Sequence, residues 1–285
     1  MNPIVYHIAS GGSFFTGVVL ICLAIVLIRM EQRVVRRLGV FLLLLGLFSV
    51  SVASTPLPYW LLGLLLSVAF VWLISHVREK WRPWMTIAVV LACSGAAVWE
   101  AGYWVIPRPH RVELRAVTII GDSVTAGIGV PDEVTWPTLL AQQQSLAVQD
   151  LSGSGFTTAQ ALSRVKSAEV RSPLVIVEIG GNDLLAGVPA EQFRRDLDDL
   201  LTLLKQDGRQ VVMLELPLIP FHGNYGRAQR SLARKHGVLL VPKRIFLDIL
   251  APQDNTVDTI HLSPTGHQQM ADTIWKIIGP AYEGD

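Results

Sequence analysis

Long apolar runs dominate the first hundred residues, whereas the later part of the chain alternates shorter apolar stretches with polar ones. Four long runs stand out, over residues 8–28, 38–53, 57–74 and 84–106. A helix needs about 20 predominantly apolar residues to cross the hydrocarbon core of a bilayer. A helix in the core of a soluble protein is rarely apolar on every face, and the second and third runs contain no charged residue at all. The pattern therefore predicts four transmembrane helices.

Basic residues between the runs predict how these helices are oriented. Residues 29–37 contain four arginines, and residues 76–83 contain two arginines and a lysine. The first twelve residues and the turn at residues 54–59 contain neither Lys nor Arg. Because loops rich in Lys and Arg stay in the cytoplasm, both ends of the helical region, and the chain that follows it, are expected on the periplasmic or extracellular side.

One carboxylate, Glu100, lies within the fourth run. An ionisable residue at membrane depth is costly and is a functional candidate by default. Its position near Trp104, at the end of the run, would also let it reach the outer headgroup region and be solvated there. The sequence leaves both interpretations open.

From residue 113 onward, apolar runs of strand length alternate with amphipathic helical patterns. The strand-length runs lie at residues 116–120, 146–152, 174–180, 211–218 and 237–242, and the helical patterns at residues 135–145, 158–169, 190–206, 223–236 and 264–278. Strands that alternate with helices predict a parallel sheet covered by helices on both faces. Ligands of such folds bind beyond the carboxyl ends of the strands, so residues just after each strand are the candidates for a site.

Charge divides the chain in the same place as hydropathy. Residues 1–110 carry eight basic and three acidic residues, a balance of +5, whereas residues 111–285 carry sixteen and twenty, a balance of −4. Two prolines follow the fourth run and prevent the helix from continuing. We therefore expect a membrane region over residues 1–107, a linker over residues 108–113 and a polar domain over residues 114–285.

Composition excludes two classes of protein. The polar part has no stripe of basic residues, which argues against a nucleic acid as partner. The only two cysteines, Cys22 and Cys93, both lie in apolar runs. Neither a disulfide framework nor a metal–thiolate cluster is therefore expected, and both residues fit the role of small buried hydrophobes.

Four short motifs occur in order along the polar part. They read GDSVTAG at residues 121–127, GSG at residues 153–155, GGND at residues 180–183 and DTIH at residues 258–261. Together they resemble the SGNH, or GDSL-type, hydrolase family, and the surrounding sequence looks most similar to its bacterial lysophospholipase/thioesterase-like esterases. The resemblance implies an α/β fold, a flavodoxin-like three-layer sandwich with a five-stranded parallel sheet. Here that domain would be preceded by an all-α membrane region of four transmembrane helices.

The same resemblance implies roles for five residues. Ser123 matches the nucleophile, His261 the base that takes its proton, and Asp258 the carboxylate that orients the imidazole. The backbone N–H groups of Ser123 and Gly155 and the side-chain amide of Asn182 match the oxyanion hole. Glycine at position 155 is expected to permit close backbone approach. No metal ion and no organic cofactor are implied.

The resulting prediction is a serine esterase anchored as a multi-pass protein in the bacterial inner membrane, with its catalytic domain on the outer side. It would hydrolyse carboxylic esters through an acyl-enzyme, with lysophospholipids or other lipid esters as favoured substrates, because the short linker holds the site near the outer leaflet. Phe156 stands where the lysophospholipase-like members usually have a polar residue, which leaves the substrate preference open. Two alternatives remain: a deacetylase or acyltransferase acting on cell-envelope polysaccharide, and a non-catalytic envelope scaffold.

Overall fold

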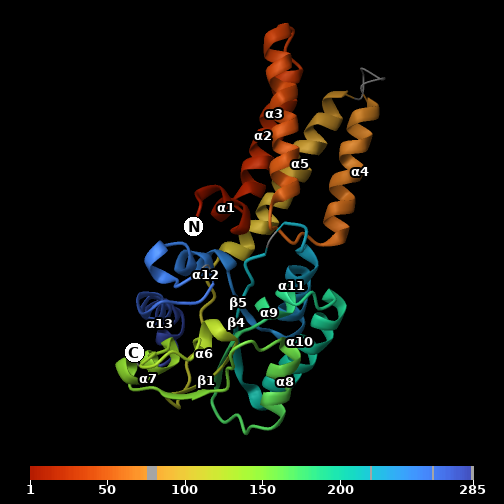
Figure 1. The fold of residues 1–285 in the computed structure, drawn as a ribbon. Helices are drawn as coiled ribbons and strands as arrows, with labels where there is room; N and C mark the ends of the chain where they lie inside the picture. The colour runs from red at the N-terminus through yellow and green to blue at the C-terminus, as the bar shows by residue number, and fades with distance from the viewer. Residues whose placement is uncertain (76–81, 219, 259, 284–285) are drawn as a thin grey trace. The chain divides into compact units, whose positions relative to one another are not determined.

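The chain folds into two compact units, each with its own interior. The computed structural model describes residues 1–75, 82–218, 220–258 and 260–283 (Figure 1). Of the basic loop predicted between the third and fourth runs, Arg78 and Lys80 lie outside the described residues. The helical unit comprises Pro3–Trp104 and the segment Leu218–Gly223, and the α/β unit comprises Met1–Asn2, Val105–Pro217 and Asn224–Asp285.

Each predicted apolar run overlaps one long helix of the helical unit. These helices are α2 (Gly12–Ile28), α3 (Arg33–Val52), α4 (Tyr59–Ser75) and α5 (Arg82–Ala101), with α1 (Pro3–Ala9) before them and the 3-10 turn η1 (Gly102–Trp104) after them. The first run is not one straight helix, because α1 and α2 are bent by 85° at a break. Gly11 lies at this break with φ of 85°, a conformation that glycine adopts without steric cost.

Two helices among the described residues are long and apolar enough to cross a membrane. They are α3 and the stretch Pro83–Trp104 of α5 and η1. The bent pair α1 and α2 adds a third candidate if it forms a single span, whereas the apolar part of α4, Tyr59–Trp72, is shorter. Length and composition thus give two or three candidate spans in the described part of the chain, not the four that the sequence pattern predicts.

The interior of the helical unit is closely packed. A Cβ added at Gly17 would lie 2.7 Å from the carbonyl oxygen of Gly46 and 2.9 Å from the amide nitrogen of Val50. These distances leave no room for a side chain, so α2 and α3 pack backbone against backbone, as small residues allow between membrane helices. Glu100 of α5 is also buried, so it does not have the solvated surface position that one of the two interpretations requires.

The α/β unit is built on a five-stranded parallel sheet, which confirms the predicted fold class. Its strands are β1 (Ala116–Gly121), β2 (Ala147–Asp150), β3 (Leu174–Glu178), β4 (Gln210–Leu214) and β5 (Leu239–Val241), and every pairing is parallel. Their order in the sheet is β2-β1-β3-β4-β5. The chain therefore winds in one direction from β1 to β2 and in the other from β3 onward. Flavodoxin-like folds with this order bind ligands at the switch point, beyond the carboxyl ends of β1 and β3.

Helices cover both faces of the sheet and complete a three-layer sandwich. They are α6 (Ser123–Ala126), α7 (Trp136–Gln144), α8 (Thr158–Lys166), α9 (Gly181–Leu185), α10 (Ala190–Leu204), α11 (Gly223–His236), α12 (Lys243–Leu250) and α13 (Pro264–Ile278). Figure 1 shows α7, α12 and α13 on one side of the sheet and α8, α10 and α11 on the other. Val117, Ile119 and Ile176 point to the first side, where they belong to one core cluster with Trp136 and Ile274. Because side chains alternate along a strand, the intervening residues pack against the second group of helices.

The predicted helical patterns correspond to α7, α8, α10, α11 and α13. The sequence pattern missed α6, α9 and α12, which have only four, five and eight residues. Helices this short contain too few turns to show a period of 3.6 residues. Two of the missed helices carry the candidate site. Helix α6 begins two residues after the end of β1, and α9 begins three residues after the end of β3.

Candidate active site

Ser123 lies just beyond the carboxyl end of β1, as the first residue of α6. All six residues of β1 are buried, so the strand determines where the chain leaves the sheet. The carboxylate of Asp122 accepts the Val124 N–H at 2.9 Å and caps the short helix. A Cβ at Gly121 would lie 2.2 Å from the hydroxyl of Thr125, so this tight turn requires glycine there. The local sequence thus presents Ser123 on a compact strand-to-helix turn.

His261 and Asp258 form a series of hydrogen bonds with Ser123. His261 Nε2 lies 3.1 Å from Ser123 Oγ, although the two residues are 138 positions apart in the sequence. His261 Nδ1 lies 2.6 Å from Asp258 Oδ2. Asp258 Oδ1 accepts the N–H groups of Ile260 and His261 at 2.7 and 2.8 Å, so acid and base share one tight loop. The structure therefore brings together the three residues that the motifs predict.

The Asp258 carboxyl stays ionised far into the acid range. The hydrogen bond from His261 lowers the pKa of Asp258 most, and the N–H groups of Ile260 and His261 lower it further. The side chain is 53% exposed, so burial opposes these effects only weakly. An ionised carboxylate that accepts Nδ1–H leaves Nε2 free to accept a proton from the serine hydroxyl. The arrangement can therefore activate Ser123.

The expected oxyanion-hole residues lie on loops that are hydrogen-bonded to one another. Asn182 Nδ2 donates to the carbonyl oxygen of Phe156 at 3.1 Å, and the N–H of Gly153 donates to the carbonyl oxygen of Gly121 at 3.1 Å. These two bonds connect the loop after β2 to α9 and to β1. Gly155 has φ of 77°, and a Cβ there would meet no atom of the chain within 4 Å. The positive φ, and not a lack of space beside neighbouring atoms of the chain, therefore favours glycine at this position.

Two buried carboxyl groups, those of Asp183 and Glu178, flank the site. Asp183 Oδ2 accepts the N–H and the hydroxyl of Thr158 at 2.8 and 3.0 Å, so it connects α9 to the start of α8. Glu178, the last residue of β3, is 2% exposed and accepts the Thr125 hydroxyl at 2.8 Å. No motif singles out Glu178. The signal that could have found it is an acidic residue in the otherwise apolar strand LVIVE.

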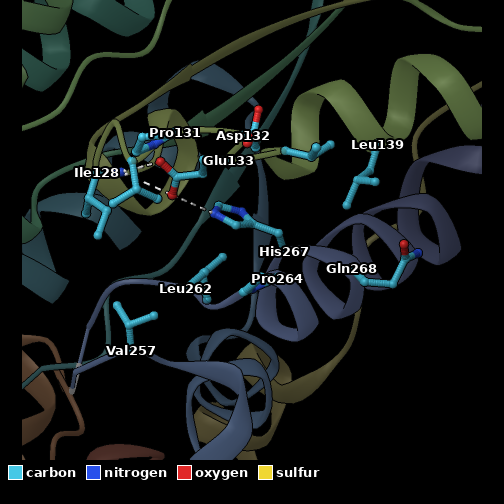
Figure 2. A pocket seen from close by; sticks show the side chains of 12 residues that line it. Ile128, Pro131, Asp132, Glu133, Leu139, Val257, Leu262, Pro264, His267 and Gln268 are labelled. Atoms are coloured by element: carbon cyan, nitrogen blue, oxygen red, sulfur yellow. Dashed lines mark hydrogen bonds and ion pairs between the residues drawn. The ribbon is translucent and has the colours of Figure 1, made fainter.

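An apolar pocket lies next to the loops that carry Ser123 and His261. Its volume is about 270 Å³, and Figure 2 shows the side chains that line it. The lining residues are Ile128, Val130, Pro131, Asp132, Glu133, Val134, Leu139, Val257, Leu262, Pro264, His267 and Gln268. The walls thus adjoin, but do not include, Ser123 and His261.

His267 forms part of the wall of this pocket as a buried, neutral side chain. Its Nδ1 accepts the Trp136 N–H at 3.3 Å, and its Nε2 lies 3.5 Å from Glu133 Oε1 (Figure 2). Burial lowers the pKa of His267, although Glu133 opposes this effect. Glu133 also accepts the N–H groups of Ile128 and Gly129 at 3.0 and 2.8 Å. The pair therefore shapes the loop that follows α6.

The groups that converge at the carboxyl end of β1 suit acyl transfer. They are a hydroxyl, an imidazole, a carboxylate and N–H donors, the set that a serine nucleophile and an oxyanion require. Within the described ranges, no group of three or more His, Cys, Asp or Glu side chains is arranged to hold a metal ion.

Comparison with known proteins finds relatives among esterases. Residues 119–269 match the family model described as the GDSL-like Lipase/Acylhydrolase family. An arylesterase from Vibrio mimicus is 30% identical over 171 residues, which cover 55% of this chain and 84% of the relative. Thioesterase 1/protease 1/lysophospholipase L1 from Escherichia coli K12 is 30% identical over 179 residues, which cover 59% and 85%. Esterase TesA from Pseudomonas aeruginosa is 28% identical over 187 residues, which cover 60% and 91%.

Solved structures show the same similarity. A crystal structure of TesA matches with a TM-score of 0.52 at 26% identity, covering 58% of this chain and 99% of that chain. The psychrotrophic esterase EstA from Pseudoalteromonas sp., inhibited by monoethylphosphonate, matches with a TM-score of 0.53 at 21% identity, covering 58% and 97%. At that lower identity the likeness concerns the fold alone.

Proposed function

The chain belongs to the GDSL-like Lipase/Acylhydrolase family and is a serine ester hydrolase, and we propose that Ser123, His261 and Asp258 are its catalytic triad. One observation carries this assignment: Ser123 Oγ, the two imidazole nitrogens of His261 and Asp258 Oδ2 are joined by contacts of 3.1 and 2.6 Å. A serine hydroxyl is a weak nucleophile until an adjacent base takes its proton. These distances place the base within reach of the hydroxyl and the acid within reach of the base.

The triad would act in two half-reactions. In the first, His261 Nε2 takes the hydroxyl proton of Ser123 while Oγ attacks the ester carbonyl carbon. His261 then gives this proton to the leaving alkoxide, so that the alcohol departs and the acyl group stays on Ser123. In the second, a water molecule loses a proton to His261 and attacks the acyl carbonyl carbon. The bond between that carbon and Ser123 Oγ then breaks, His261 returns the proton to Oγ, and the carboxylic acid is released. Asp258 accepts a hydrogen bond from His261 Nδ1–H throughout and stabilises the transient imidazolium.

The oxyanion of each tetrahedral intermediate would be held by the N–H groups of Ser123 and Gly155 and by Asn182 Nδ2. The loops of Gly155 and Asn182 follow β2 and β3, the two strands on either side of β1, so both border the carboxyl end of β1. The amide of Asn182 donates to Phe156, and an amide NH₂ group has a second hydrogen to donate. Its orientation is therefore set before the substrate binds.

Loss of the Asn182 amide is expected to reduce turnover. Asn182→Ala should lower kcat by about 10²- to 10³-fold with little change in KM, because the oxyanion exists only in the transition state and the intermediate. Steady-state kinetics with a p-nitrophenyl ester measure both constants. Asn182→Asp keeps the shape of the side chain but replaces the donor by a negative charge, so it should be at least as slow. Gln143→Ala, which removes an exposed amide, is the control, and an unchanged kcat in Asn182→Ala would exclude this role.

Apolar side chains around the triad support a lipid ester as the substrate. Exposed apolar residues lie on the loop after α6, on α9 and on the loop that carries His261: Ile128, Val130, Val134, Leu185, Val257 and Ile260. Four of them also line the pocket in Figure 2. Exposed apolar groups clustered in this way are typical of sites for apolar ligands or membranes. The relative from Escherichia coli carries lysophospholipase in its name, which favours the same class of substrate.

The helical unit would anchor the enzyme in the bacterial inner membrane through four helices, α2 to α5. Only two glycines of α3 are buried, so this helix exposes apolar side chains on almost every side, as a membrane helix does. Helices α2 and α4 have 17 residues each, which is the lower end of the range of about 17–25 that spans a bilayer. Four spans are therefore compatible with the helix lengths.

The catalytic unit would lie on the periplasmic or extracellular side of that membrane. Arg29 after α2 and the three arginines at the start of α3 favour a cytoplasmic location for that turn, which places the end of α5 on the opposite side. Residues 105–115 connect η1 to β1, and a segment of that length reaches at most about 40 Å. The site would therefore stay close to the outer leaflet.

The preference for lipid esters is tested by comparing substrates on the full-length protein in liposomes. We expect kcat/KM for a lysophospholipid to exceed that for an acetylated sugar more than about 10-fold, because each buried methylene contributes about 0.8 kcal/mol. Ser123→Ala in the same liposomes measures the background. Faster hydrolysis of the acetylated sugar would contradict the lipid preference and favour a deacetylase of envelope polysaccharide instead.

A further inference from the structure

The turn that carries Ser123 rests on a pair of buried carboxyl groups. Glu178 at the end of β3 is 2% exposed, and Asp122 at the end of β1 is 4% exposed. Glu178 Oε2 accepts the hydroxyl of Thr125 at 2.8 Å and the N–H of Asp122 at 3.4 Å. These two donors lie one residue before and two residues after Ser123, so one carboxyl oxygen holds both sides of the turn.

The two carboxyl groups are also neighbours: Glu178 Oε2 accepts the backbone N–H of Asp122, and each group shifts the pKa of the other. A hydrogen bond between two carboxyl groups needs a proton on one of them, and two buried negative charges in contact would be strongly unfavourable. Among the described residues, no Lys or Arg forms an ion pair with either group. The pair therefore holds one shared proton in place of a balancing cation.

The surroundings place this proton on Glu178. Burial raises the pKa of Glu178 well above its usual value, and the adjacent charge of Asp122 raises it further. Burial also raises the pKa of Asp122, but the N–H of Val124 and the charge of His261 lower it, while Asp183 opposes them. Asp122 is thus the ionised partner and accepts the proton of Glu178.

Two glycines without side chains leave room for this pair of carboxyl groups. A Cβ at Gly121 would lie 3.1 Å from Glu178 Oε2, and one at Gly181 would lie 3.2 Å from Asp122 Oδ2. The pair therefore fits between two glycine backbones, one on β1 and one at the start of α9. Displacing it would disturb the turn of Ser123 and the helix of Asn182 together.

We propose that Glu178 is a positioning residue for ester hydrolysis: in its protonated form it donates to Asp122, accepts from Thr125 and so holds Ser123 in its reactive place. This inference rests on the proposed role of Ser123 as nucleophile. Glu178 contacts neither the substrate nor His261 in this role. It acts through the turn, and it needs a proton to do so.

Two substitutions separate a need for a protonated side chain from a need for a carboxylate. Glu178→Gln supplies a neutral side chain whose NH₂ donates to Asp122 and whose oxygen accepts from Thr125. Glu178→Leu has a similar size but neither function, and it leaves Asp122 buried without its donor. We expect kcat of the glutamine variant to stay within about threefold of wild type, and kcat of the leucine variant to fall by about 10- to 100-fold with little change in KM. Circular dichroism and thermal unfolding check that both variants fold.

The pH dependence gives a readout that a purely structural role would not change. Glu178 is protonated below its raised pKa and ionises as the pH rises through it, so the wild-type kcat should fall on the alkaline side. A profile from about pH 6 to about pH 10 should show this fall in wild type and not in Glu178→Gln, which has no proton to lose. Glu191→Gln, a substitution of an exposed acid paired with Arg194, is the control and should keep the wild-type profile.

The outcomes separate this inference from the assignment of the nucleophile. Equal kcat values for Glu178→Gln and Glu178→Leu, whether both high or both low, overturn the role of the proton. The role of the proton is also overturned if the wild-type kcat does not fall at alkaline pH, or if the kcat of Glu178→Gln falls there as well. Labelling of wild type and of both variants by a fluorophosphonate probe, with none in Ser123→Ala, shows in every case whether Ser123 is the nucleophile.

Discussion

Alanine at Ser123 and alanine at His261 are each expected to lower kcat for ester hydrolysis by about 10⁶-fold, and the double variant should be no slower than either. The reason is that the two side chains perform one step. Without the imidazole the hydroxyl keeps its proton, and without the hydroxyl the imidazole has no proton to take. The 3.1 Å contact between Oγ and Nε2 is the structural basis for this coupling. Turnover of a p-nitrophenyl ester and labelling by a fluorophosphonate probe measure the two consequences.

Matched controls come from the surface of the same unit. Ser163→Ala removes a hydroxyl that only donates within α8, to the carbonyl oxygen of Ala159, and His110→Ala removes an exposed imidazole. Both variants should label and turn over like wild type. Losses in Ser123→Ala and His261→Ala that multiply in the double variant would contradict the shared step. Retained labelling in Ser123→Ala would place the nucleophile elsewhere.

The α/β fold could be predicted because its pattern repeats along the chain. Buried strands and amphipathic helices of nine to fifteen residues each carry enough residues to show a period, and their alternation implies a parallel sheet. The apolar pattern of the helical unit was misleading at one point, residues 10–11. A hydropathy average over the run does not register a single glycine. The positive φ of Gly11 nevertheless allows the chain to bend between α1 and α2.

The candidate site could be predicted only where a motif marks it. Ser123, Asn182 and His261 stand in short sequences that resemble a known family, so their convergence could be expected before any contact was known. Glu178 stands in no such motif, and an acidic residue at the end of a strand ordinarily faces solvent. Its burial beside Asp122 depends on the register of β3 against β1, which pairs Gly121 with Glu178. Local sequence does not determine the register between two strands that are separated along the chain by three helices and a further strand.

Asp258→Asn is expected to lower kcat by about 10⁴-fold while the variant keeps its fold, as the corresponding change does in serine proteases. The asparagine oxygen can still accept the N–H groups of Ile260 and His261, so the loop should keep its shape. In place of Oδ2, however, the amide presents a donor to His261 Nδ1. The imidazole must then accept at Nδ1 and carry its proton on Nε2, the atom that has to receive the proton of Ser123. Kinetics with the same ester, and the crystal structure or thermal unfolding of the variant, measure the two parts of this prediction.

The pKa of Asp258 determines the pH range in which its carboxylate supports kcat. Because the hydrogen bond from His261 lowers this pKa, the carboxylate persists above its depressed pKa and is lost only as the pH falls through that value. An ordinary aspartate is half protonated at about pH 3.9, so wild type should show no loss of kcat from Asp258 at that pH or above. Asp272→Asn, an exposed acid on α13 that accepts from Gln268, should match wild type. A fall in kcat of less than about tenfold in Asp258→Asn would mean that His261 keeps its tautomer without this carboxylate, and Ser123 and His261 would then act as a dyad.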